Sequence, residues 1–434
     1  MWFNAVYLLL IVAASPLLLF RSLRHGKYRQ GWQAKLLGRT GLPPSDRPRI
    51  WLHAVSVGEV SLLRRLVTRL EREYPGHPCV ISTTTVTGYE LACKHFGSQR
   101  VFYCPLDFSW AVRCAIAEIQ PAMLVLAELE VWPNLIAGAS RQNVPVVVIN
   151  GRLSESSYRG YQKLGHLVRN TFSRLSLVAC QDETYAQRFI DVGVPAEAVQ
   201  VTGSIKFDDA PTDRQTPQAM ACADRAGLRP WHRVWIAGST QAGEETVVLN
   251  SYQQLRERFP NLRLLIVPRH PQRFDACAAE IESQGFHCIR RSTLPDDFAA
   301  EPLSADSVFL VDTIGELRDW WATADIAFVG GSLGSRGGQN MLEPAGYGAA
   351  VCFGPNTRNF RDIVSHLLAA DAAVVVDDGE ALTAFVERCL SDVPAAEQLG
   401  IAAQAVVQQH RGATEKTLRL IAPLLSGGQQ RVAA

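Results

Sequence analysis

Short runs of β-branched and other apolar residues alternate along the chain with longer segments in which apolar residues recur at helical spacing. This alternation constrains the fold most strongly, because near-continuous apolar strands separated by helices form parallel sheets covered on both faces. The strands expected in the first half are Arg49–Ser56, Cys79–Thr85, Val101–Pro105, Met123–Glu128, Val144–Asn150, Leu177–Gln181 and Val199–Ser204. Those expected in the second half are Val234–Ala237, Leu262–Val267, Val308–Asp312, Ile326–Gly330, Ala350–Phe353 and Ala373–Val376.

The two halves are separated by a polar stretch that carries two prolines, residues 208–217. A chain of 434 residues is expected to form two or three domains. The pattern therefore predicts two Rossmann-like domains, residues 49–209 and residues 210–434. A final helix from Ala402 to Leu425 is assigned to the second domain, although it could pack on either one.

The first 20 residues carry no charge, and the apolar run from Trp2 to Phe20 is about as long as a membrane-spanning helix. Basic residues follow it between Arg21 and Arg39, and the first acidic residue is Asp46. A cleaved signal peptide would carry its positive charge before the apolar run. We therefore expect residues 1–20 to be a membrane anchor, residues 21–48 a basic juxtamembrane helix and linker, and the rest cytoplasmic. A spanning anchor, an anchor in one leaflet and a buried soluble helix all fit the segment.

The ten cysteines are scattered, without a C-x-x-C motif or histidines at metal-binding spacing. Several lie within apolar runs, as buried thiols do in a reducing compartment. Neither a disulfide framework nor a zinc site is expected. A net charge of +1 does not point to nucleic acid, which is not among the expected partners.

Acidic residues follow two of the expected strands in the first half. Glu59 follows Gly58 at the start of a helix, where it could serve as a general base or only favour the helix start. Glu128 and Glu130 end another strand and precede Trp132 and a proline. This pair could bind Mg²⁺ as D-x-D motifs do, but no third acid lies near it, and acids satisfied by backbone amides are the alternative.

Three segments of the second half suit an anion, and each follows an expected strand. In residues 238–245, Ser239 and Thr240 precede a helix start and are candidate phosphate contacts. Arg269 ends the next strand and could pair with a phosphate or carboxylate. Residues 330–344 combine five glycines with Glu343, whose carboxylate could accept hydrogen bonds from a ribose.

Taken together, these segments resemble a known family, the 3-deoxy-D-manno-oct-2-ulosonic acid (Kdo) transferases of lipopolysaccharide biosynthesis. Members are inner-membrane enzymes that transfer Kdo from CMP-Kdo to a lipid A precursor. The matching stretches are Trp51–Glu59, Glu128–Leu135, Asn150–Ser154, Val201–Asp208, Val267–His270, Asp312–Leu317, Arg336–Pro344 and Asn359–Ile363.

The resemblance implies a GT-B fold, with the donor in the C-terminal domain and the acceptor against the N-terminal one. It implies CMP contacts at Pro268, Arg269, Ile314, Gly315, Glu316, Asn340, Met341, Leu342 and Glu343. It further implies catalytic roles for Glu59 and Lys206, and an acceptor-side role for the Glu128–Glu130 pair. Lys206 could instead form a salt bridge between the domains. The implied reaction inverts the anomeric centre of Kdo on lipid IVA, with CMP-Kdo as a substrate and with neither metal nor cofactor.

One position departs from the family pattern. Members carry a glutamate, assigned as the acceptor-activating base, in a W-x-E-[RK] context, whereas this chain has Ala34 between Gln33 and Lys35. Either Glu59 is the base, or the chain is an impaired, membrane-tethered CMP-sugar-binding homologue, or the sequence was altered there. A GT-B transferase that uses a UDP-sugar on a lipid is the other alternative.

Overall fold

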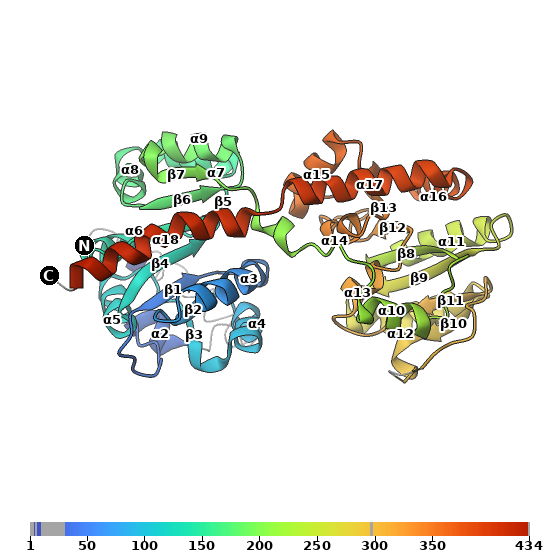
Figure 1. Cartoon of the computed structure of the whole chain (residues 1–434), viewed down its shortest axis with the longest axis horizontal. Coiled ribbons are helices and arrows are strands. Elements are labelled where there is room, and N and C mark those ends of the chain that lie inside the picture. Colours follow the sequence, from blue (N-terminus) through green and yellow to red (C-terminus); the bar gives the residue numbers. More distant parts are fainter. Residues whose placement is uncertain (1–3, 5–6, 10–30, 296–297, 433–434) are drawn as a thin grey trace. The chain divides into compact units, whose positions relative to one another are not determined.

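The structure is a computed structural model that describes residues 4, 7–9, 31–295 and 298–432. Most of the expected anchor, residues 1–20, and the following residues 21–30 lie outside the described residues. In the described ranges, no helix combines the length and the apolar character needed to cross a membrane. The chain forms two compact units, residues 1–209 with 411–434 and residues 210–410 (Figure 1).

The first unit is built on a parallel sheet of seven strands in the order β3-β2-β1-β4-β5-β6-β7. The strands are β1 (Arg49–His53), β2 (Cys79–Thr83), β3 (Val101–Tyr103), β4 (Pro121–Ala127), β5 (Val146–Gly151), β6 (Leu177–Cys180) and β7 (Val199–Val201). The strand order reverses between β1 and β4. In open α/β sheets, ligands bind outside the carboxyl ends of the strands at such a switch point.

Helices and short 3₁₀ segments connect these strands. The helices are α2 (Trp32–Leu37), α3 (Val57–Glu73), α4 (Val86–Phe96), α5 (Ser109–Ile119), α6 (Pro133–Arg141), α7 (Glu155–Leu164), α8 (His166–Phe172) and α9 (Glu183–Asp191). The 3₁₀ segments are η1 (Ser98–Arg100), η2 (Ala196–Ala198) and η3 (Ile205–Asp209). Because α2 falls within the expected juxtamembrane segment, part of that segment is helical.

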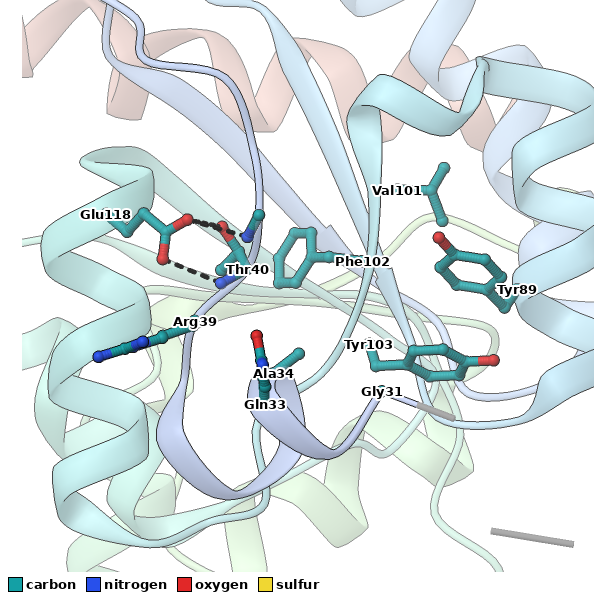
Figure 2. Close-up of a pocket in the computed structure, with 11 residues that line it drawn as sticks. Gly31, Gln33, Ala34, Arg39, Thr40, Tyr89, Val101, Phe102, Tyr103 and Glu118 are labelled. Atoms are coloured by element: carbon teal, nitrogen blue, oxygen red, sulfur yellow. Dashed lines mark hydrogen bonds between the residues drawn. The ribbon is translucent and has the colours of Figure 1, made fainter. Parts of the chain in front are cut away.

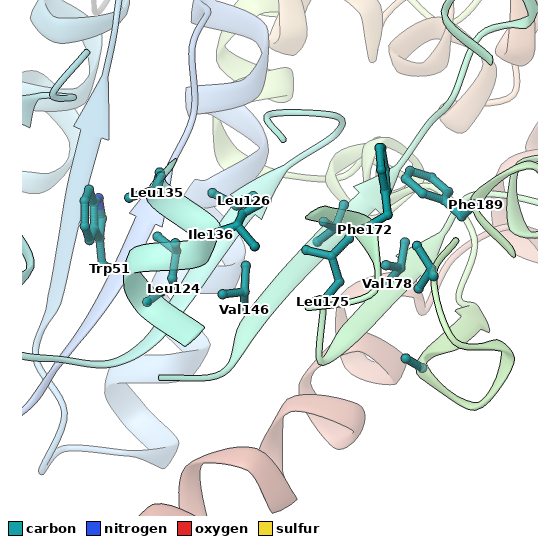
Figure 3. Packing of buried hydrophobic residues seen from close by; sticks show 14 of the residues in the cluster. Trp51, Leu124, Leu126, Leu135, Ile136, Val146, Phe172, Leu175, Val178 and Phe189 are labelled. Atoms are coloured by element: carbon teal, nitrogen blue, oxygen red, sulfur yellow. The ribbon is translucent and has the colours of Figure 1, made fainter. Parts of the chain in front are cut away.

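Both faces of the first sheet are buried, as the alternating side chains of its central strands show. Trp51, Leu124 and Leu126 belong to the apolar cluster on one face (Figure 3). Ile50 and Met123, their neighbours in sequence, belong to the cluster on the other face. This arrangement explains why the strands are almost continuously apolar in sequence.

The second unit repeats the architecture with the strand order β10-β11-β9-β8-β12-β13-β14, also parallel. Its strands are β8 (Arg233–Thr240), β9 (Leu262–Pro268), β10 (His287–Arg290), β11 (Ser307–Leu310), β12 (Ile326–Val329), β13 (Ala350–Phe353) and β14 (Val374–Val375). Its helices are α10 (Pro217–Arg225), α11 (Glu244–Leu255), α12 (Phe274–Ser283), α13 (Leu317–Trp321), α14 (Leu342–Gly346), α15 (Arg361–Ala369), α16 (Gly379–Ser391) and α17 (Val393–Gln409). The 3₁₀ segments are η4 (Pro271–Arg273), η5 (Arg291–Thr293) and η6 (Arg358–Phe360).

The sequence pattern misplaces some strand ends and misses β10. Strand β1 ends at His53 rather than at Ser56, because Ser56 is the N-cap of α3 and belongs to the helix start. Strand β10 has the sequence His-Cys-Ile-Arg and lies at the sheet edge without a fully buried side chain. Its polar ends remove the apolar signal on which strand prediction depends.

The C-terminal segment corrects the expected domain assignment. The single helix expected from Ala402 to Leu425 is two helices, α17 and α18 (Ala413–Val432), and residues 411–434 belong to the first unit rather than the second. Leu418 and Ile421 of α18 are buried in the core of the first unit. In Figure 1, α18 is the red helix that runs along the first sheet, where it contacts α3, β4 and β6.

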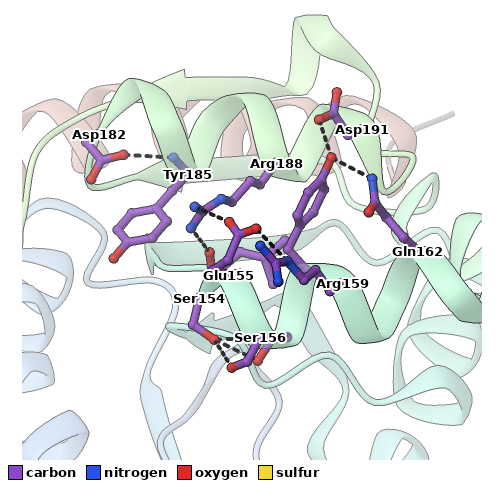
Figure 4. Close-up of polar contacts among 12 residues, drawn as sticks. Ser154, Glu155, Ser156, Arg159, Gln162, Asp182, Tyr185, Arg188 and Asp191 are labelled. Atoms are coloured by element: carbon purple, nitrogen blue, oxygen red, sulfur yellow. Dashed lines mark hydrogen bonds and ion pairs between the residues drawn. The ribbon is translucent and has the colours of Figure 1, made fainter.

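Polar contacts join α7 to α9. No residue of α7 is fully buried. Arg188 of α9 binds Glu155 of α7 at 2.5 Å and also donates to the backbone oxygen of Leu153. The hydroxyl group of Tyr158 donates to Asp191 at 2.8 Å. Figure 4 shows these contacts on the surface of the first unit.

The start of α18 depends on Asp208, a buried residue of η3. Its two carboxylate oxygens accept hydrogen bonds from the backbone N–H groups of Gly412 and Thr414, each at 2.6 Å. These bonds satisfy N–H groups that have no partner within the helix itself.

Replacing Asp208 with alanine should destabilise the first unit by about 2–3 kcal/mol, because two charge-assisted bonds to a helix start are lost. Chemical denaturation followed by circular dichroism measures this loss. The matched control is Asp46→Ala, at an exposed position of the same unit. Equal stability of the two variants would show that Asp208 does not hold α18.

Candidate active site

Acidic and basic side chains gather at the switch point of the first sheet. Glu59 follows β1, Glu128 and Glu130 follow β4, and Lys206 follows β7. The sequence pattern indicated the three acids and the family resemblance implied Lys206, and the structure places all four in one cluster at the carboxyl ends of the strands. Burial raises the pKa of Glu130, and the nearby charges of Glu59 and Glu128 raise it further, while Lys206 lies 3.4 Å from Glu128.

Glu59 takes part in the start of its own helix. Its carboxylate accepts hydrogen bonds from the N–H of Val55 and from the hydroxyl of Ser56, both at 2.8 Å. The Ser56 oxygen accepts the N–H of Glu59 in return, which completes a variant of the capping box in which Glu59 accepts the N–H of Val55 instead of that of the N-cap residue. Burial raises the pKa of Glu59, and its own hydrogen bonds oppose that rise. Because both of its oxygens are bonded, Glu59 is less available for proton transfer than a carboxylate with an open position.

Glu128 is held on the other side of the cluster. Its backbone has a φ of 56°, in the left-handed region that non-glycine residues rarely adopt. Its carboxylate lies 3.4 Å from the ammonium group of Lys206 and 3.5 Å from the side-chain amide of Asn150. The Asn150 oxygen accepts the N–H of Ile205, which links β5 to the segment that carries Lys206. The salt bridge of Lys206 therefore lies within the first unit.

Glu130 is the carboxylate of the cluster best suited to proton transfer. It is partly exposed, and one of its oxygens accepts a hydrogen bond from the Trp132 indole at 2.9 Å. Burial raises the pKa of Glu130 to about 7, and the charge of Glu59 is the next largest cause. The same oxygen lies 3.9 Å from Nε2 of His53, a buried histidine. A carboxyl group with a pKa near neutrality can both accept and release a proton at physiological pH.

A second set of polar groups lies at the strand ends of the second unit. Arg269 directly follows β9 and is exposed, and within the described chain its guanidinium group makes no hydrogen bond or ion pair. Glu343 begins α14 beside Asn340, to which it is hydrogen-bonded. Burial raises the pKa of Glu343, while Arg318 and Arg269 oppose that rise. Arg269 and Glu343 are therefore near enough for their charges to interact.

The other predicted donor contacts divide into exposed and buried residues. Ile314 is 78% exposed, and Gly315 beside it has a φ of 91° with open space around its Cα. The Glu316 carboxylate accepts hydrogen bonds from Arg291 and Trp320. Met341, Leu342 and Pro268 are buried as whole residues and expose almost no surface to a ligand.

The glycine-rich loop after β12 does not offer all of its amides to a ligand. The buried carboxylate of Glu244 accepts the N–H groups of Gly331, Ser332 and Leu333 at 2.7–3.0 Å. The Glu244 carboxylate thus binds amides of the glycine-rich loop that the sequence suggested for a bound anion. The hydroxyl of Thr240 is also fully buried and donates to Glu245, which argues against Thr240 as a phosphate contact. Ser239 is 8% exposed and has a φ of 57°.

Ala34, the residue that departs from the family pattern, lies on α2. Its side chain is 8% exposed and lines a pocket of about 720 Å³ with Gln33, Tyr103 and others (Figure 2). The pocket lies beside β3, the edge strand of the first sheet. Figure 2 also shows Glu118, which accepts hydrogen bonds from the backbone and the hydroxyl group of Thr40. A glutamate at position 34 would place a carboxyl group at this pocket.

Solved structures share the fold. A UDP-GlcNAc 2-epimerase from Neisseria meningitidis matches 86% of this chain and 100% of its own, with a TM-score of 0.56 and 11% identity. A glycosyltransferase from Rickettsia africae matches 88% of this chain and 99% of its own, also with a TM-score of 0.56 and 11% identity. Two parallel-sheet α/β units with polar groups at their strand ends define a protein of the GT-B glycosyltransferase fold.

Sequence relatives narrow the class further. Residues 29–209 match the family profile of 3-deoxy-D-manno-octulosonic-acid transferase (kdotransferase). A 3-deoxy-D-manno-octulosonic acid transferase from Haemophilus influenzae is 35% identical, with 98% of this chain and 99% of the relative aligned. One from Bordetella pertussis is 34% identical, with 96% and 98% aligned. The chain belongs to the 3-deoxy-D-manno-octulosonic acid transferase family, and it is a glycosyltransferase.

Three residues that position the site were not predicted from the sequence: His53, Asn150 and Glu244. His53 carries a local signal, because a histidine at an inward position of an apolar strand needs a polar partner. Asn150 and Glu244 carry no such signal, since their partners lie 55 and up to 89 residues away.

Proposed function

We propose that this chain transfers Kdo from CMP-Kdo to a lipid A precursor, lipid IVA, and inverts the anomeric centre. The observation that carries the proposal is the acid cluster of the first unit, in which the pKa of Glu130 is about 7. The chain's membership of this family supports the same reaction. The acceptor hydroxyl must lose a proton as the new bond forms, and Glu130 is the group best placed to take it. Attack in one step on the face opposite the leaving CMP inverts the centre.

The donor is proposed to bind the second unit. Its single phosphate would pair with Arg269, and Glu343 would accept hydrogen bonds from the ribose of CMP. The exposed backbone of Ile314 and Gly315 offers further contacts. Because CMP leaves with one phosphate, a guanidinium group and backbone amides can balance its charge. We therefore propose catalysis without a metal or a cofactor.

Association with a membrane is proposed through the apolar N-terminal segment and the basic residues that follow. Two residues of that segment lie on the first unit. Asn4 exchanges hydrogen bonds with Ser109 and accepts one from Asn134, and Tyr7 donates to Asp107 at 3.0 Å. A helix spanning ~30 Å of hydrocarbon would carry Asn4 to the side opposite this unit. These contacts support attachment to one leaflet. The basic residues after the apolar run are the basis for proposing that both units lie on the cytoplasmic side of the inner membrane.

Ala34 supports a second candidate function, that of an impaired homologue which binds the CMP-sugar without transferring it. The Glu130 cluster favours an active enzyme, because it supplies a base without a carboxylate at position 34. A single-turnover assay with CMP-Kdo and lipid IVA distinguishes the two. We expect transfer of Kdo by the unmodified chain. CMP binding without transfer, together with transfer by Ala34→Glu, would establish the impaired homologue instead.

Substitutions of Glu130 and Glu59 test which of the two carboxylates is the base. Glu130→Gln should lower transfer by 10²–10⁴-fold, the usual contribution of a general base. Glu59→Gln should retain transfer, because glutamine can still complete the capping box. It should also extend activity to lower pH, since loss of the Glu59 charge lowers the pKa of Glu130 and keeps it ionised in more acidic solution.

The rate of transfer against pH measures both effects. For the unmodified chain, the rate should fall as pH drops below about 7, where Glu130 becomes protonated. CMP affinity serves as the control for folding in both variants. If Glu59→Gln abolishes transfer while Glu130→Gln leaves it intact, Glu59 is the base.

Donor binding is tested at Arg269. Arg269→Ala should weaken CMP binding by about 1.5–3 kcal/mol, the range for a charge-assisted hydrogen bond. Isothermal titration calorimetry with CMP measures the change, and Arg388→Ala, at an exposed position of α16, is the matched control. Unchanged affinity in folded Arg269→Ala would remove Arg269 from the donor site.

A further inference from the structure

His53 is the last residue of β1 and is completely buried beside the acid cluster. Its Nδ1 lies 3.2 Å from the backbone oxygen and 2.9 Å from the hydroxyl oxygen of Ser82, on the neighbouring strand β2. A carbonyl oxygen only accepts hydrogen bonds, so Nδ1 must carry a proton to bond with it. The position of Ser82 therefore fixes the tautomer of the neutral ring.

The surroundings of the Ser82 hydroxyl agree with this tautomer. Its oxygen accepts a hydrogen bond from the Trp51 indole at 2.7 Å. A hydroxyl oxygen has two acceptor sites, so it can also accept from a protonated Nδ1 of His53. Nε2 is then the unprotonated nitrogen, with its lone pair available.

Nε2 has no hydrogen-bond partner in the part of the chain that the structure describes. A buried nitrogen left unpaired is costly, and few occur in folded proteins. A carboxylate oxygen of Glu130 lies 3.9 Å away. Movement of about 1 Å would close this distance to that of a hydrogen bond, and such bonds commonly tighten only when substrate binds.

We propose that His53 is a positioning residue that receives the hydrogen bond of Glu130 once Glu130 has taken a proton from the acceptor. This role rests on the proposed function. The acceptor O–H bond breaks and a Glu130 O–H bond forms, which donates to Nε2. The electron pair left on the acceptor oxygen forms the new bond to Kdo, while the bond from Kdo to the CMP phosphate oxygen breaks. That bond's electron pair leaves with CMP, so atoms and charges balance.

Other groups around Glu130 also shift its pKa. The carboxylates of Glu59 and Glu128 favour the protonated form, and the Trp132 indole favours the ionised form. Tyr161 and Cys104 are near enough for Glu130 to raise their pKa values. Burial lowers the pKa of His53 to about 4, so the ring stays neutral across the working range and acts only as an acceptor.

The test compares two substitutions of His53. In His53→Asn, the side-chain amide can still donate to Ser82, but no atom replaces Nε2. We expect kcat to fall about 10-fold at pH 7, and the acidic limb of the pH profile to move about one unit lower. Both effects match the loss of about one net hydrogen bond to protonated Glu130. KM for CMP-Kdo should not change. His53→Gln, whose amide oxygen can reach the position of Nε2, should restore part of both effects.

A spectroscopic measurement separates this inference from the proposed function. Difference infrared spectra between the unmodified chain and Glu130→Gln report the titration of the Glu130 carboxyl without any substrate. This titration should move about one unit lower in the His53→Asn background, even if no Kdo transfer is found. Circular dichroism and CMP affinity show whether each variant is folded. If His53→Asn does not fold, His53→Leu, which also has no acceptor at the position of Nε2, serves for the same comparison. An unchanged Glu130 titration in folded His53→Asn would overturn the proposal.

Discussion

Bonds between buried carboxylates and backbone amides hold the loops from which both sites are built. Glu244 binds three amides of the glycine-rich loop, Asp208 binds two at the start of α18, and Asp107 binds two at the start of α6. Each acid loses hydration on burial, and several short bonds from N–H groups offset that loss. These bonds tie the loops and helix starts beside the strand ends to the chain around them.

Hydrogen bonding also distinguishes Glu59, which stabilises a helix start, from Glu130, the proposed base. Glu59 was an attractive base in the sequence because it opens a helix directly after a strand. In the structure, a capping box engages both of its oxygens, and its charge acts on Glu130 instead. Glu130 has one indole donor and remains partly exposed. The number of hydrogen bonds that each carboxylate already makes, which a sequence does not reveal, distinguishes the two.

Local patterns predicted the two parallel sheets, most of the strands and the acids Glu59, Glu128 and Glu130 after strands, whereas Lys206 was implied only by the family resemblance. These features depend on residues close in sequence, on apolar spacing and on the rule that ligands bind at carboxyl ends. The pairing of Glu244 with the glycine-rich loop could not be predicted, because it joins residues 87 to 89 positions apart. Strand β10 was missed because a short edge strand needs little apolar surface.

The return of α18 to the first unit makes the second unit an insertion within the first. During synthesis, a ribosome would complete residues 210–410 before it released the helix that contributes Leu418, Ile421 and Leu425 to the first core. Domains generally fold in the order in which they emerge. Here the unit that begins first is completed only after the second unit has been synthesised. A premature stop near the C-terminus would leave an apolar strip of the first sheet uncovered while sparing the second unit.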